Sequence, residues 1–392
     1  MKSGWYFAFC CALFVLVTDC ILWLFIRKGI KYKWLKTAYW AVTLLFIASA
    51  FLYQLLIPRL SGPELYRTIS LIIGVVVTLY FPKAVCAIAK TVLLPLSAAG
   101  FRRPVNIFSA FLFTILFALC LFGFTAGRYS YKINRSDVSF ANLPDDLRGL
   151  RIAHISDLHL GSVSPDYKGY ERLVEKVNAE KPDLILFSGD IVNNFAEEIE
   201  PFIPVLQKFK ARYGVYGVTG NHDYGSYVRW KSPDAKAANF RRLIENEEAA
   251  GIRLLMNENV KIKIGRDTLM LAGVENWGKP PFPQYGDIDA ALKGRDSLFT
   301  VLLSHDPSHW RAQVLGYNVP LTLSGHTHAM QAGISLFGFK WSPSKYIYPE
   351  YDGLYREGEC CLNVSRGAGY IGLPGRIGLR PAIDILTLTK SR

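Results

Sequence analysis

The fold is decided by five short stretches beyond residue 150: ISDLH at 155–159, FSGD at 187–190, TGNHD at 219–223, LSHD at 303–306 and LSGHTH at 323–328. In each of them an apolar run passes directly into a polar segment that carries Asp, Asn or His. This pattern is typical of buried strands whose carboxyl ends lead into the functional loops of an α/β protein. We therefore predict an α/β unit with a polar site at one end of its sheet.

The pattern of strand, loop and helix begins near Leu150 and continues to the end of the sequence. Strands are expected at 150–155, 183–187, 214–219, 298–303, 319–323, 361–364 and 383–389. The spacing of Leu173, Val174 and Val177 predicts a helix over 170–178.

The polar residues after these strands have the chemistry of metal ligands. They are Asp157, His159, Asp190, Asn221, His222, His305, His326 and His328. Imidazole nitrogens mixed with carboxylate oxygens suit Mn, Zn or Fe, whereas Ca²⁺ prefers oxygens alone. The set is too large for one tetrahedral ion and fits two divalent metal ions about 3.5–4 Å apart, which would activate water for attack at phosphorus.

These blocks, in this order, resemble the calcineurin-like metallophosphoesterases over roughly residues 150–390. Together with the apolar first third, the chain is similar to the membrane-anchored branch of that family, the transmembrane proteins with a metallophosphoesterase domain. The segment from Ser365 to Pro381 also resembles that branch. The resemblance implies a four-layer α-β-β-α sandwich preceded by an all-α membrane domain of about four transmembrane helices.

The resemblance also implies a role for each matching residue. It implies Asp157, His159 and His328 as ligands of a first metal ion, Asn221, His305 and His326 as ligands of a second, and Asp190 as the bridge. His222 would protonate the leaving oxygen or donate a hydrogen bond in the transition state, with Asp223 orienting its ring. Many relatives have a second Asp where this chain has Asn193, which we expect to alter the hydrogen bonds around Asp190. Arg366 is a candidate ligand of the substrate phosphate, with a structural salt bridge as the alternative.

The first third of the chain has the pattern of a membrane domain. Apolar runs near 5–26, 38–57, 68–89 and 107–127 each approach the roughly 20 residues needed to span a bilayer. We therefore predict three parts: a transmembrane helical domain at 1–128, a linker at 129–149 and a catalytic domain at 150–392. Asp19 interrupts the first run, and we expect it to bond another helix, a transport or relay role being the alternative.

The net charge of +13 belongs to this membrane domain. Residues 1–135 hold 15 Lys and Arg against only Asp19 and Glu64, whereas residues 136–392 hold 30 of each sign. Basic residues beside apolar runs orient helices and meet anionic lipids, so we expect no nucleic-acid partner. The 51% of hydrophobic and 20% of charged residues exclude a disordered chain, and seven Cys in 392 residues exclude a small disulfide scaffold.

The loops also predict an orientation in the membrane. With four crossings, the first and third loops hold nine basic residues and the opposite side holds six. Because Lys and Arg concentrate on the cytoplasmic side, we expect an integral protein of the inner cell membrane with an extracytoplasmic catalytic domain. If 68–101 crosses twice or not at all, the catalytic domain faces the cytoplasm instead.

Some other features of the sequence could also indicate a function. GAGYIG at 367–372 matches a dinucleotide fingerprint only formally, because Pro374 follows at once, so we expect a glycine-rich turn near the metals. The aromatic segment 337–355 is predicted to be a packed loop or, beside a membrane, a lipid-facing rim. His154 is expected to point into the sheet, and His309 to lie at the surface or behind the ligands.

The hypothesis that follows is a membrane-anchored, two-metal phosphoesterase acting on a phosphodiester or pyrophosphate, in a lipid or lipid-linked substrate. One alternative is a UDP-2,3-diacylglucosamine pyrophosphatase-like enzyme of lipid A synthesis, which a cytoplasmic active site would favour. An alternative of another class is a non-catalytic membrane receptor or scaffold that retains the metal site.

Overall fold

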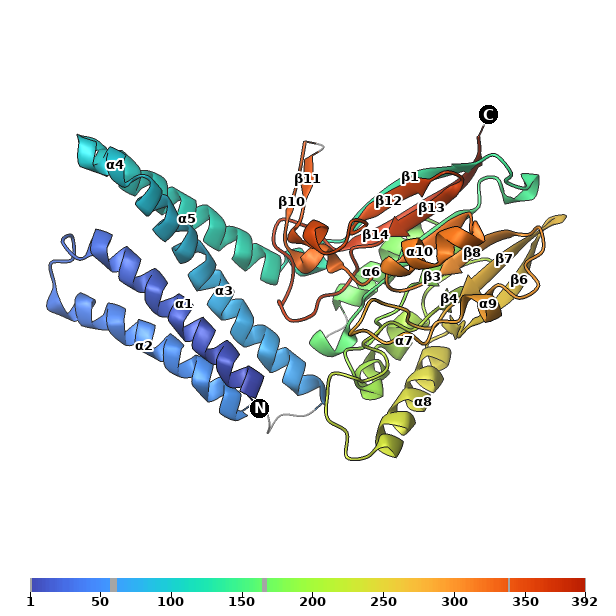
Figure 1. The fold of residues 1–392 in the computed structure, drawn as a ribbon, viewed down its shortest axis with the longest axis horizontal. Coiled ribbons are helices and arrows are strands. Elements are labelled where there is room, and N and C mark those ends of the chain that lie inside the picture. The colour runs from blue at the N-terminus through green and yellow to red at the C-terminus, as the bar shows by residue number, and fades with distance from the viewer. Residues whose placement is uncertain (1, 57–61, 164–167, 338, 392) are drawn as a thin grey trace. The chain divides into compact units, whose positions relative to one another are not determined.

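The chain divides into two compact units, Met1–Thr125 and Ala126–Arg392. The structure is a computed structural model and describes residues 2–56, 62–163, 168–337 and 339–391. Figure 1 shows a helical first unit and a second unit built on sheets. Each unit is described separately below.

The first unit consists of helices that are long and apolar enough to cross a membrane. They are α1 (Lys2–Ile26), α2 (Lys33–Leu56), α3 (Gly62–Val92) and α5 (Arg102–Phe124), with α4 (Leu94–Leu96) and a π-helical turn (Ser97–Phe101) before the last. By length and composition, four candidate membrane spans occur among the described residues. This agrees with the predicted number of spans.

The third helix is longer than the predicted span at 68–89. It continues as one helix through Pro82 and ends at Val92. The chain then reverses around Gly100, whose φ of 98° is open to glycine without strain. The stretch 68–101 is therefore a single long helix followed by a tight reversal.

Asp19 lies inside the first unit and is fully buried. Its carboxylate accepts hydrogen bonds from Thr43 Oγ1 at 2.7 Å and Tyr80 OH at 3.0 Å. Lys83 Nζ donates to it at 3.0 Å and supplies the opposite charge. The prediction of a structural bond to another helix is confirmed, because both α2 and α3 contribute partners.

Within the described residues, the second unit forms two six-stranded sheets. The first has the order β1-β14-β2-β3-β4-β5, with β1 (Lys132–Phe140), β2 (Arg151–Ile155), β3 (Leu184–Phe187), β4 (Val215–Gly217), β5 (Arg253–Leu254) and β14 (Ala382–Lys390). The second has the order β12-β13-β9-β8-β7-β6, with β6 (Glu258–Ile264), β7 (Asp267–Gly273), β8 (Phe299–Leu303), β9 (Leu321–Ser324), β12 (Gly353–Glu357) and β13 (Cys360–Val364).

Apolar clusters hold these sheets and their helices in four layers. One cluster packs α6 (Lys168–Ala179), α7 (Ile203–Leu206) and α8 (Pro233–Ala249) on the outer face of the first sheet. A second lies between the sheets, and a third packs α9 (Ile288–Ala291) and α10 (Ser308–Ala312) on the outer face of the second sheet. Figure 1 shows helices on both sides of the paired sheets. The four-layer α-β-β-α sandwich is confirmed.

The strand directions position the site. β2, β3 and β4 run parallel in the first sheet, and β7, β8, β9 and β13 run parallel in the second. The polar segments predicted from the sequence follow β2, β3, β4, β8 and β9. Their side chains therefore leave the strands at carboxyl ends, where α/β folds place their ligands.

The predicted linker at 129–149 is wrong for its central part, because β1 occupies 132–140 and belongs to the first sheet. It pairs in parallel with β14, from Lys132 opposite Ala382 to Phe140 opposite Lys390. Val138 and Phe140 are buried between the sheets. The strand was missed because it is an edge strand whose other residues are mostly polar, so its apolar run is too short to stand out.

Candidate metal centre

Two groups of buried side chains lie at the carboxyl ends of the strands. Asp157, His159 and His328 form the first group, and Asp190, His305 and His326 form the second. Within each group, one ligand atom of each residue lies within 4.8 Å of the others. The first group has the same members as the first set expected from the sequence, and the second brings Asp190 together with two of the three residues expected for the second metal ion.

The first group is held by loops after β2 and β9. His328 Nε2 lies 3.2 Å from Asp157 Oδ1 and 3.0 Å from His159 Nε2. The two imidazole rings are stacked, with centroids 4.9 Å apart. Three ligand atoms therefore converge on a space of the size that one ion requires.

Asp190, after β3, reaches both groups with the same oxygen. Its Oδ2 lies 3.1 Å from His305 Nε2 in the second group and 3.7 Å from His159 Nε2 in the first. Its Oδ1 accepts the backbone N–H of His222 at 2.9 Å, which fixes the carboxylate. One oxygen between two sets of imidazoles is the geometry of a bridging ligand.

Asn221 and His326 complete the second group. Asn221 Oδ1 lies 2.8 Å from His326 Nδ1, while Asn221 Nδ2 donates to Tyr227 OH at 2.8 Å. The amide is thus oriented with its oxygen toward the ligand set. His326 Nε2 lies 2.8 Å from Tyr348 OH, which fixes the ring from its other side.

His305 shows that this donor set fits a cation. Its Nδ1 donates to the Ser188 carbonyl at 2.6 Å, because a carbonyl oxygen can only accept. Its Nε2 lies 3.1 Å from Oδ2 of Asp190. An imidazole nitrogen this close to a carboxylate is stable only with positive charge between them, which a proton supplies here and a divalent ion would supply in its place.

The protonation states also suit metal binding. Burial lowers the pKa of His159 and of His326, so both imidazoles are neutral at pH 7. Burial alone would raise the pKa of the Asp190 carboxyl, but His305 and His222 hold it well below its usual value. Burial lowers and the Asp190 carboxylate raises the pKa of His305, to about 10, which again marks a place for positive charge.

The backbone at the ligands is strained. Positive φ angles occur at Asp157 (54°), His159 (46°), Asp190 (56°), His326 (70°) and His328 (50°). Non-glycine residues in this region cost energy and cluster at functional sites. The glycines beside them allow close approach, since a Cβ on Gly220 would lie 2.2 Å from Asp190 Oδ1 and one on Gly325 would lie 1.8 Å from Ser156 Oγ.

His222 lies beside the two groups, but its ring is not held as expected. Its Nδ1 donates to the Asn193 carbonyl at 2.9 Å. Asp223 instead accepts the backbone N–H groups of Gly220 at 2.7 Å and Asp190 at 2.9 Å. The predicted orienting role of Asp223 is therefore wrong, because its carboxylate points back into the loops and fixes their backbone.

Asn193 lies behind the metal ligands, as expected. Its Oδ1 accepts from His159 Nδ1 at 2.9 Å, and its Nδ2 donates to Ser162 Oγ at 3.0 Å. The side chain thus sets the orientation of His159 in the first group and does not bond Asp190. It acts on the surroundings of Asp190 through His159, whose Nε2 lies 3.7 Å from Asp190 Oδ2.

Arg366 does not face a substrate site. It is 3% exposed, and its Nε lies 3.3 Å from Asp352 Oδ1. The alternative of a structural salt bridge is confirmed, since a guanidinium that is buried against a carboxylate has no access to a substrate phosphate.

The other two histidines are structural. His154 lies between the sheets and bonds Ser188 and Asn363, as expected for a side chain pointing into the fold. His309 is fully buried, where it bonds Ser304 and Gln313. A surface position for His309 is therefore excluded.

A cavity of about 410 Å³ opens in front of the ligands. Its polar wall includes Asp190, Asn221 and His222, and its apolar wall is made by Phe282, Met330, Ile347, Tyr348 and Ile371. The sequence did not single out Phe282 or Tyr348. The density of aromatic residues at 337–355 was the available signal for Tyr348.

An exposed apolar hairpin follows the His326–His328 loop. It consists of β10 (Ile334–Leu336) and β11 (Phe339–Trp341). Leu336 is 58% exposed, Phe337 98% and Phe339 61%. Ile347, which lines the cavity, is 57% exposed. Apolar side chains are thus exposed both at the cavity wall and in the hairpin, so this part of 337–355 is not a packed loop.

The glycine-rich turn lies against the first group. Ala368 N donates to the Ser156 carbonyl at 2.9 Å, and Gly369 N donates to the Asp157 carbonyl at 2.8 Å. A Cβ on Gly369 would meet the Leu158 carbonyl oxygen at 1.9 Å. The expected turn near the metal ligands is confirmed.

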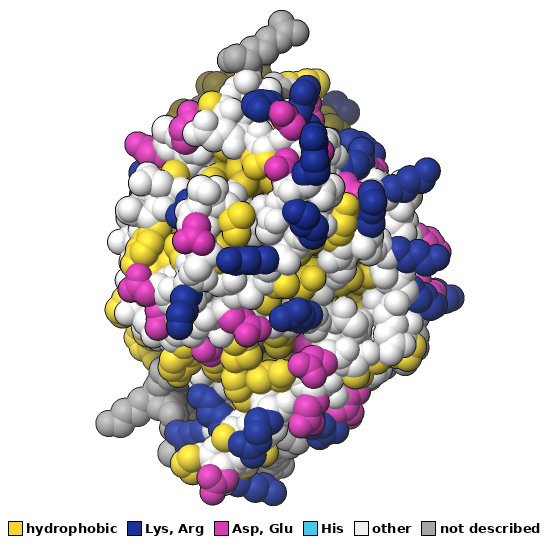
Figure 2. Space-filling view, turned by 90° about the vertical axis from the view of Figure 1, so that its right-hand side faces the viewer, with side chains coloured by type: hydrophobic (Ala, Val, Ile, Leu, Met, Phe, Trp, Pro, Cys, Tyr) yellow, Lys and Arg dark blue, Asp and Glu magenta, His cyan; other side chains and the backbone are white. Residues whose placement is uncertain are grey.

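The surface away from the site carries mixed charges. On the face drawn in Figure 2, which lies at the right of Figure 1, Lys and Arg are interspersed with Asp and Glu and no His is visible. This agrees with the charge balance of residues 136–392. No basic surface of the kind that binds nucleic acid is seen on this face.

Comparisons with known proteins place the match on the second unit. The family model of the calcineurin-like phosphoesterases matches residues 150–330. The transmembrane protein with metallophosphoesterase domain of Danio rerio is 30% identical over 284 residues, or 70% of this chain and 61% of that protein. The metallophosphoesterase YkuE of Bacillus subtilis is 32% identical over 253 residues, or 63% of this chain and 81% of that protein. A metallophosphoesterase of Helicobacter pylori (strain J99) is 31% identical over 258 residues, or 65% and 63%. The chain thus spans less than two thirds of the fish and Helicobacter proteins.

Proposed function

Because the chain belongs to the calcineurin-like metallophosphoesterases, we propose that it cleaves a phosphodiester or pyrophosphate bond in a lipid or lipid-linked substrate. Its four apolar helices and its relatives named as transmembrane proteins support a membrane-associated phosphoester hydrolase. The nature of the bond and the lipid are our inference.

Each group of ligands would hold one divalent ion. Asp157, His159 and His328 would hold the first, Asn221, His305 and His326 the second, and Asp190 both. Two such ions would supply the positive charge that polarises a phosphoryl oxygen and activates a water for attack. The observation that carries this proposal is the position of Asp190 Oδ2 between the two groups.

His222 is the candidate proton donor. Because its Nδ1 is engaged by the Asn193 carbonyl, its Nε2 is the atom left for the substrate. Burial lowers the pKa of His222, so its protonated form gives up the Nε2 proton to a leaving oxygen more readily than free imidazole does. The Asn193 carbonyl keeps the ring in that orientation.

The apolar wall of the cavity favours an amphiphilic substrate. Phe282, Met330 and Ile347 line the cavity together with the ligand residues, and the hairpin exposes further apolar side chains. An ester between phosphate and a small polar alcohol would leave these groups in contact with water. A phosphate linked to a lipid would cover them.

The test is hydrolysis of bis-p-nitrophenyl phosphate by the full chain with Mn²⁺, Zn²⁺ or Fe²⁺. Asp190→Asn should reduce turnover by at least about 100-fold, because it weakens the ligand that serves both ions. Asp234→Asn removes an exposed carboxylate from the first turn of α8 and should leave turnover unchanged. If the chain binds these ions but hydrolyses the ester with none of them, the result would favour the non-catalytic receptor.

The substrate class is tested separately with phospholipids and UDP-2,3-diacylglucosamine in mixed micelles. Cleavage of a phospholipid supports a phosphodiesterase, and cleavage of the sugar nucleotide alone supports the pyrophosphatase alternative. Turnover restricted to soluble phosphate esters would contradict a lipid substrate.

A further inference from the structure

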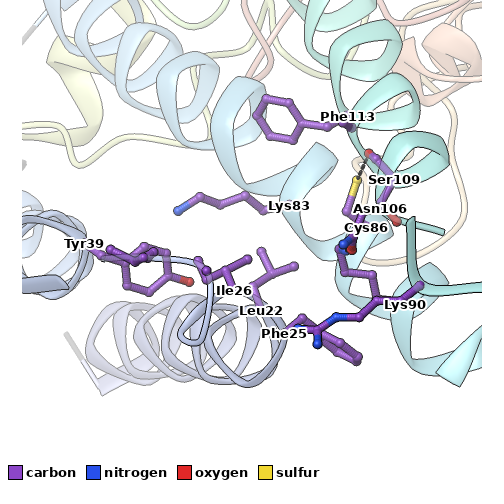
Figure 3. Close-up of a pocket in the computed structure, with 14 residues that line it drawn as sticks. Leu22, Phe25, Ile26, Tyr39, Lys83, Cys86, Lys90, Asn106, Ser109 and Phe113 are labelled. Atoms are coloured by element: carbon purple, nitrogen blue, oxygen red, sulfur yellow. Dashed lines mark hydrogen bonds between the residues drawn. The ribbon is translucent and has the colours of Figure 1, made fainter. Parts of the chain in front are cut away.

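The membrane unit contains a cavity of its own, of about 600 Å³. Figure 3 shows side chains of α1, α3 and α5, with Tyr39 of α2, lining it. Leu22, Phe25, Ile26 and Phe113 make apolar walls, and Lys83, Lys90 and Arg102 bring three positive charges to it. A cavity with both apolar walls and positive charges is unusual within membrane helices, because isolated charges are costly there.

The charge of Lys83 is already neutralised. Its Nζ lies 3.0 Å from Asp19 Oδ1, and it also lies over the ring of Tyr80 at 4.4 Å from the centroid. This ion pair explains why Lys83 is stable inside the helices. It needs no ligand.

Among the residues that the structure describes, Lys90 has no acidic partner. It is 9% exposed, and its Nζ donates to Asn106 Oδ1 at 2.6 Å. The ring of Phe25 lies 5.7 Å away. Figure 3 shows Lys90 beside Phe25 at one end of the cavity. An amide oxygen and an aromatic ring carry no net negative charge, so the buried ammonium remains uncompensated.

The first unit contains no other acid that could pair with Lys90. Residues 1–125 contain two acids in the sequence, Asp19 and Glu64. Asp19 is engaged by Lys83, and Glu64 lies in the first turn of α3 whereas Lys90 lies in its last turn. At 1.5 Å per residue that separation is roughly 40 Å. Within residues 1–125, therefore, no acid pairs with Lys90, and Arg102 at the start of α5 is exposed and open to an anionic ligand.

The position of the charges along the helices matches that of lipid phosphates. Lys90 is near the end of α3 and Arg102 begins α5, so both lie where helices reach the membrane surface. Phe113 lies roughly 16 Å further along α5, toward the middle of the bilayer. The cavity is thus charged at the level of headgroups and apolar at the level of acyl chains.

We propose that this cavity binds a phospholipid with an anionic headgroup. The phosphate pairs with Lys90 and Arg102, and an acyl chain lies against Phe25 and Phe113. The site is separate from the metal centre, and the inference does not depend on the proposed reaction. A soluble anion would match the charges but would leave the apolar walls uncovered.

The experiment is native mass spectrometry of the full chain in detergent, titrated with phosphatidic acid or with phosphatidylcholine of the same acyl chains. The wild type should bind phosphatidic acid at least about tenfold more tightly. Lys90→Met combined with Arg102→Gln should abolish this preference, because each cation near the headgroups contributes attraction for anionic lipid. Equal affinity of the wild type for both lipids would refute the proposal.

The matched control is Lys31→Gln combined with Arg103→Gln. It removes the same charge from exposed residues that do not line the cavity. It should keep the preference, and an equal loss would mean that the lipid meets only general surface charge. Ala110→Phe, which narrows the cavity and leaves its charge intact, should weaken phosphatidic acid binding even if the double variant does not fold. Full displacement of the lipid by millimolar inorganic phosphate would show a site for soluble anions and overturn the assignment.

Discussion

Asn193 illustrates how a single residue outside the ligand set can control a metal site. Its carboxamide oxygen accepts the Nδ1 proton of His159, which leaves Nε2 of that ring unprotonated toward Asp157, Asp190 and His328. Hydrogen-bond acceptors of this kind, on the ring nitrogen that does not bind the metal, orient the imidazole and raise its basicity. An Asp at this position would carry a negative charge where this chain has a neutral amide.

We predict that Asn193→Ala raises the Mn²⁺ concentration needed for half-maximal activity by about 10- to 100-fold, because His159 loses the acceptor that fixes its tautomer. The rate at saturating Mn²⁺ should fall much less. Asn193→Asp keeps the acceptor oxygen and should remain close to the wild type. An unchanged metal requirement of Asn193→Ala would show that Asn193 does not position His159.

At the level of whole elements, β1 and the β10–β11 hairpin are two strand elements that the sequence analysis did not predict. β1 extends the first sheet beyond β14 and closes one end of the core between the sheets. The hairpin does the opposite, since it carries apolar side chains out of the fold and into solvent. Burial within the second unit stabilises β1. The exposed apolar side chains of the hairpin are instead typical of a surface that binds a partner.

We predict that Phe140→Ala destabilises the protein by about 3–5 kcal/mol, as expected when a large aromatic side chain is removed from a core. Phe140 packs edge-on against Phe299, with ring centroids 5.0 Å apart, and is 3% exposed. The measurement is the thermal unfolding temperature of the full chain in detergent. Asp137→Ala changes an exposed residue of the same strand and should have little effect. Equal stability of the two variants would show that β1 is dispensable.

We predict that Leu336→Ser combined with Phe339→Ser lowers hydrolysis of a lipid substrate in vesicles by about tenfold or more. Both residues are exposed in the hairpin, and their apolar surface would contact the bilayer. Hydrolysis of bis-p-nitrophenyl phosphate should stay the same, since neither residue lines the cavity. Equal losses on both substrates would indicate damage to the metal centre, and no loss on vesicles would exclude a role of the hairpin in lipid contact.

For the molecule as a whole, the division of charge follows the division into units. Of the net charge of +13, the first unit carries +10, from 12 Lys and Arg against two acids in residues 1–125, and the second unit carries +3, from 33 against 30. In the first unit this charge flanks apolar helices and lines their cavity at Lys90 and Arg102. In the second unit, positive charge at the site would come from bound ions and is not part of the count of side chains.

We predict that the catalytic unit lies outside the cytoplasm, because the loops with more Lys and Arg mark the inner side. A cysteine introduced as Asp234→Cys, on the exposed start of α8, should react with a membrane-impermeant maleimide in intact spheroplasts. Lys31→Cys in the first loop should react only after permeabilisation. The wild-type chain provides the background from its own cysteines. The reverse pattern would place the catalytic unit in the cytoplasm.

Much of the fold could be predicted because its signals are local. Each predicted strand has an observed counterpart within a few residues, as for Asp183–Phe187 against β3 at Leu184–Phe187. The strands β1, β5, β6, β7 and β12 were not predicted, and in β1 and β6 polar residues interrupt the apolar ones. Their burial depends on the second sheet and on β14, which are distant in the sequence.

The sequence by itself determined the membrane domain, the α/β character of the second unit and the residues that gather at the metal centre. These follow from apolar length, from strand ends and from the types of side chain that bind metals. Only the tertiary structure decided what surrounds those residues. Asn193 accepts a hydrogen bond from His159, Asp223 accepts from the loop backbone, and Arg366 pairs with Asp352. The cavity beside Lys90 was likewise visible only in the structure. The physical reason is that a ligand is recognised by its own chemistry, whereas the role of a supporting side chain depends on which donors and acceptors the fold brings within about 3 Å of it.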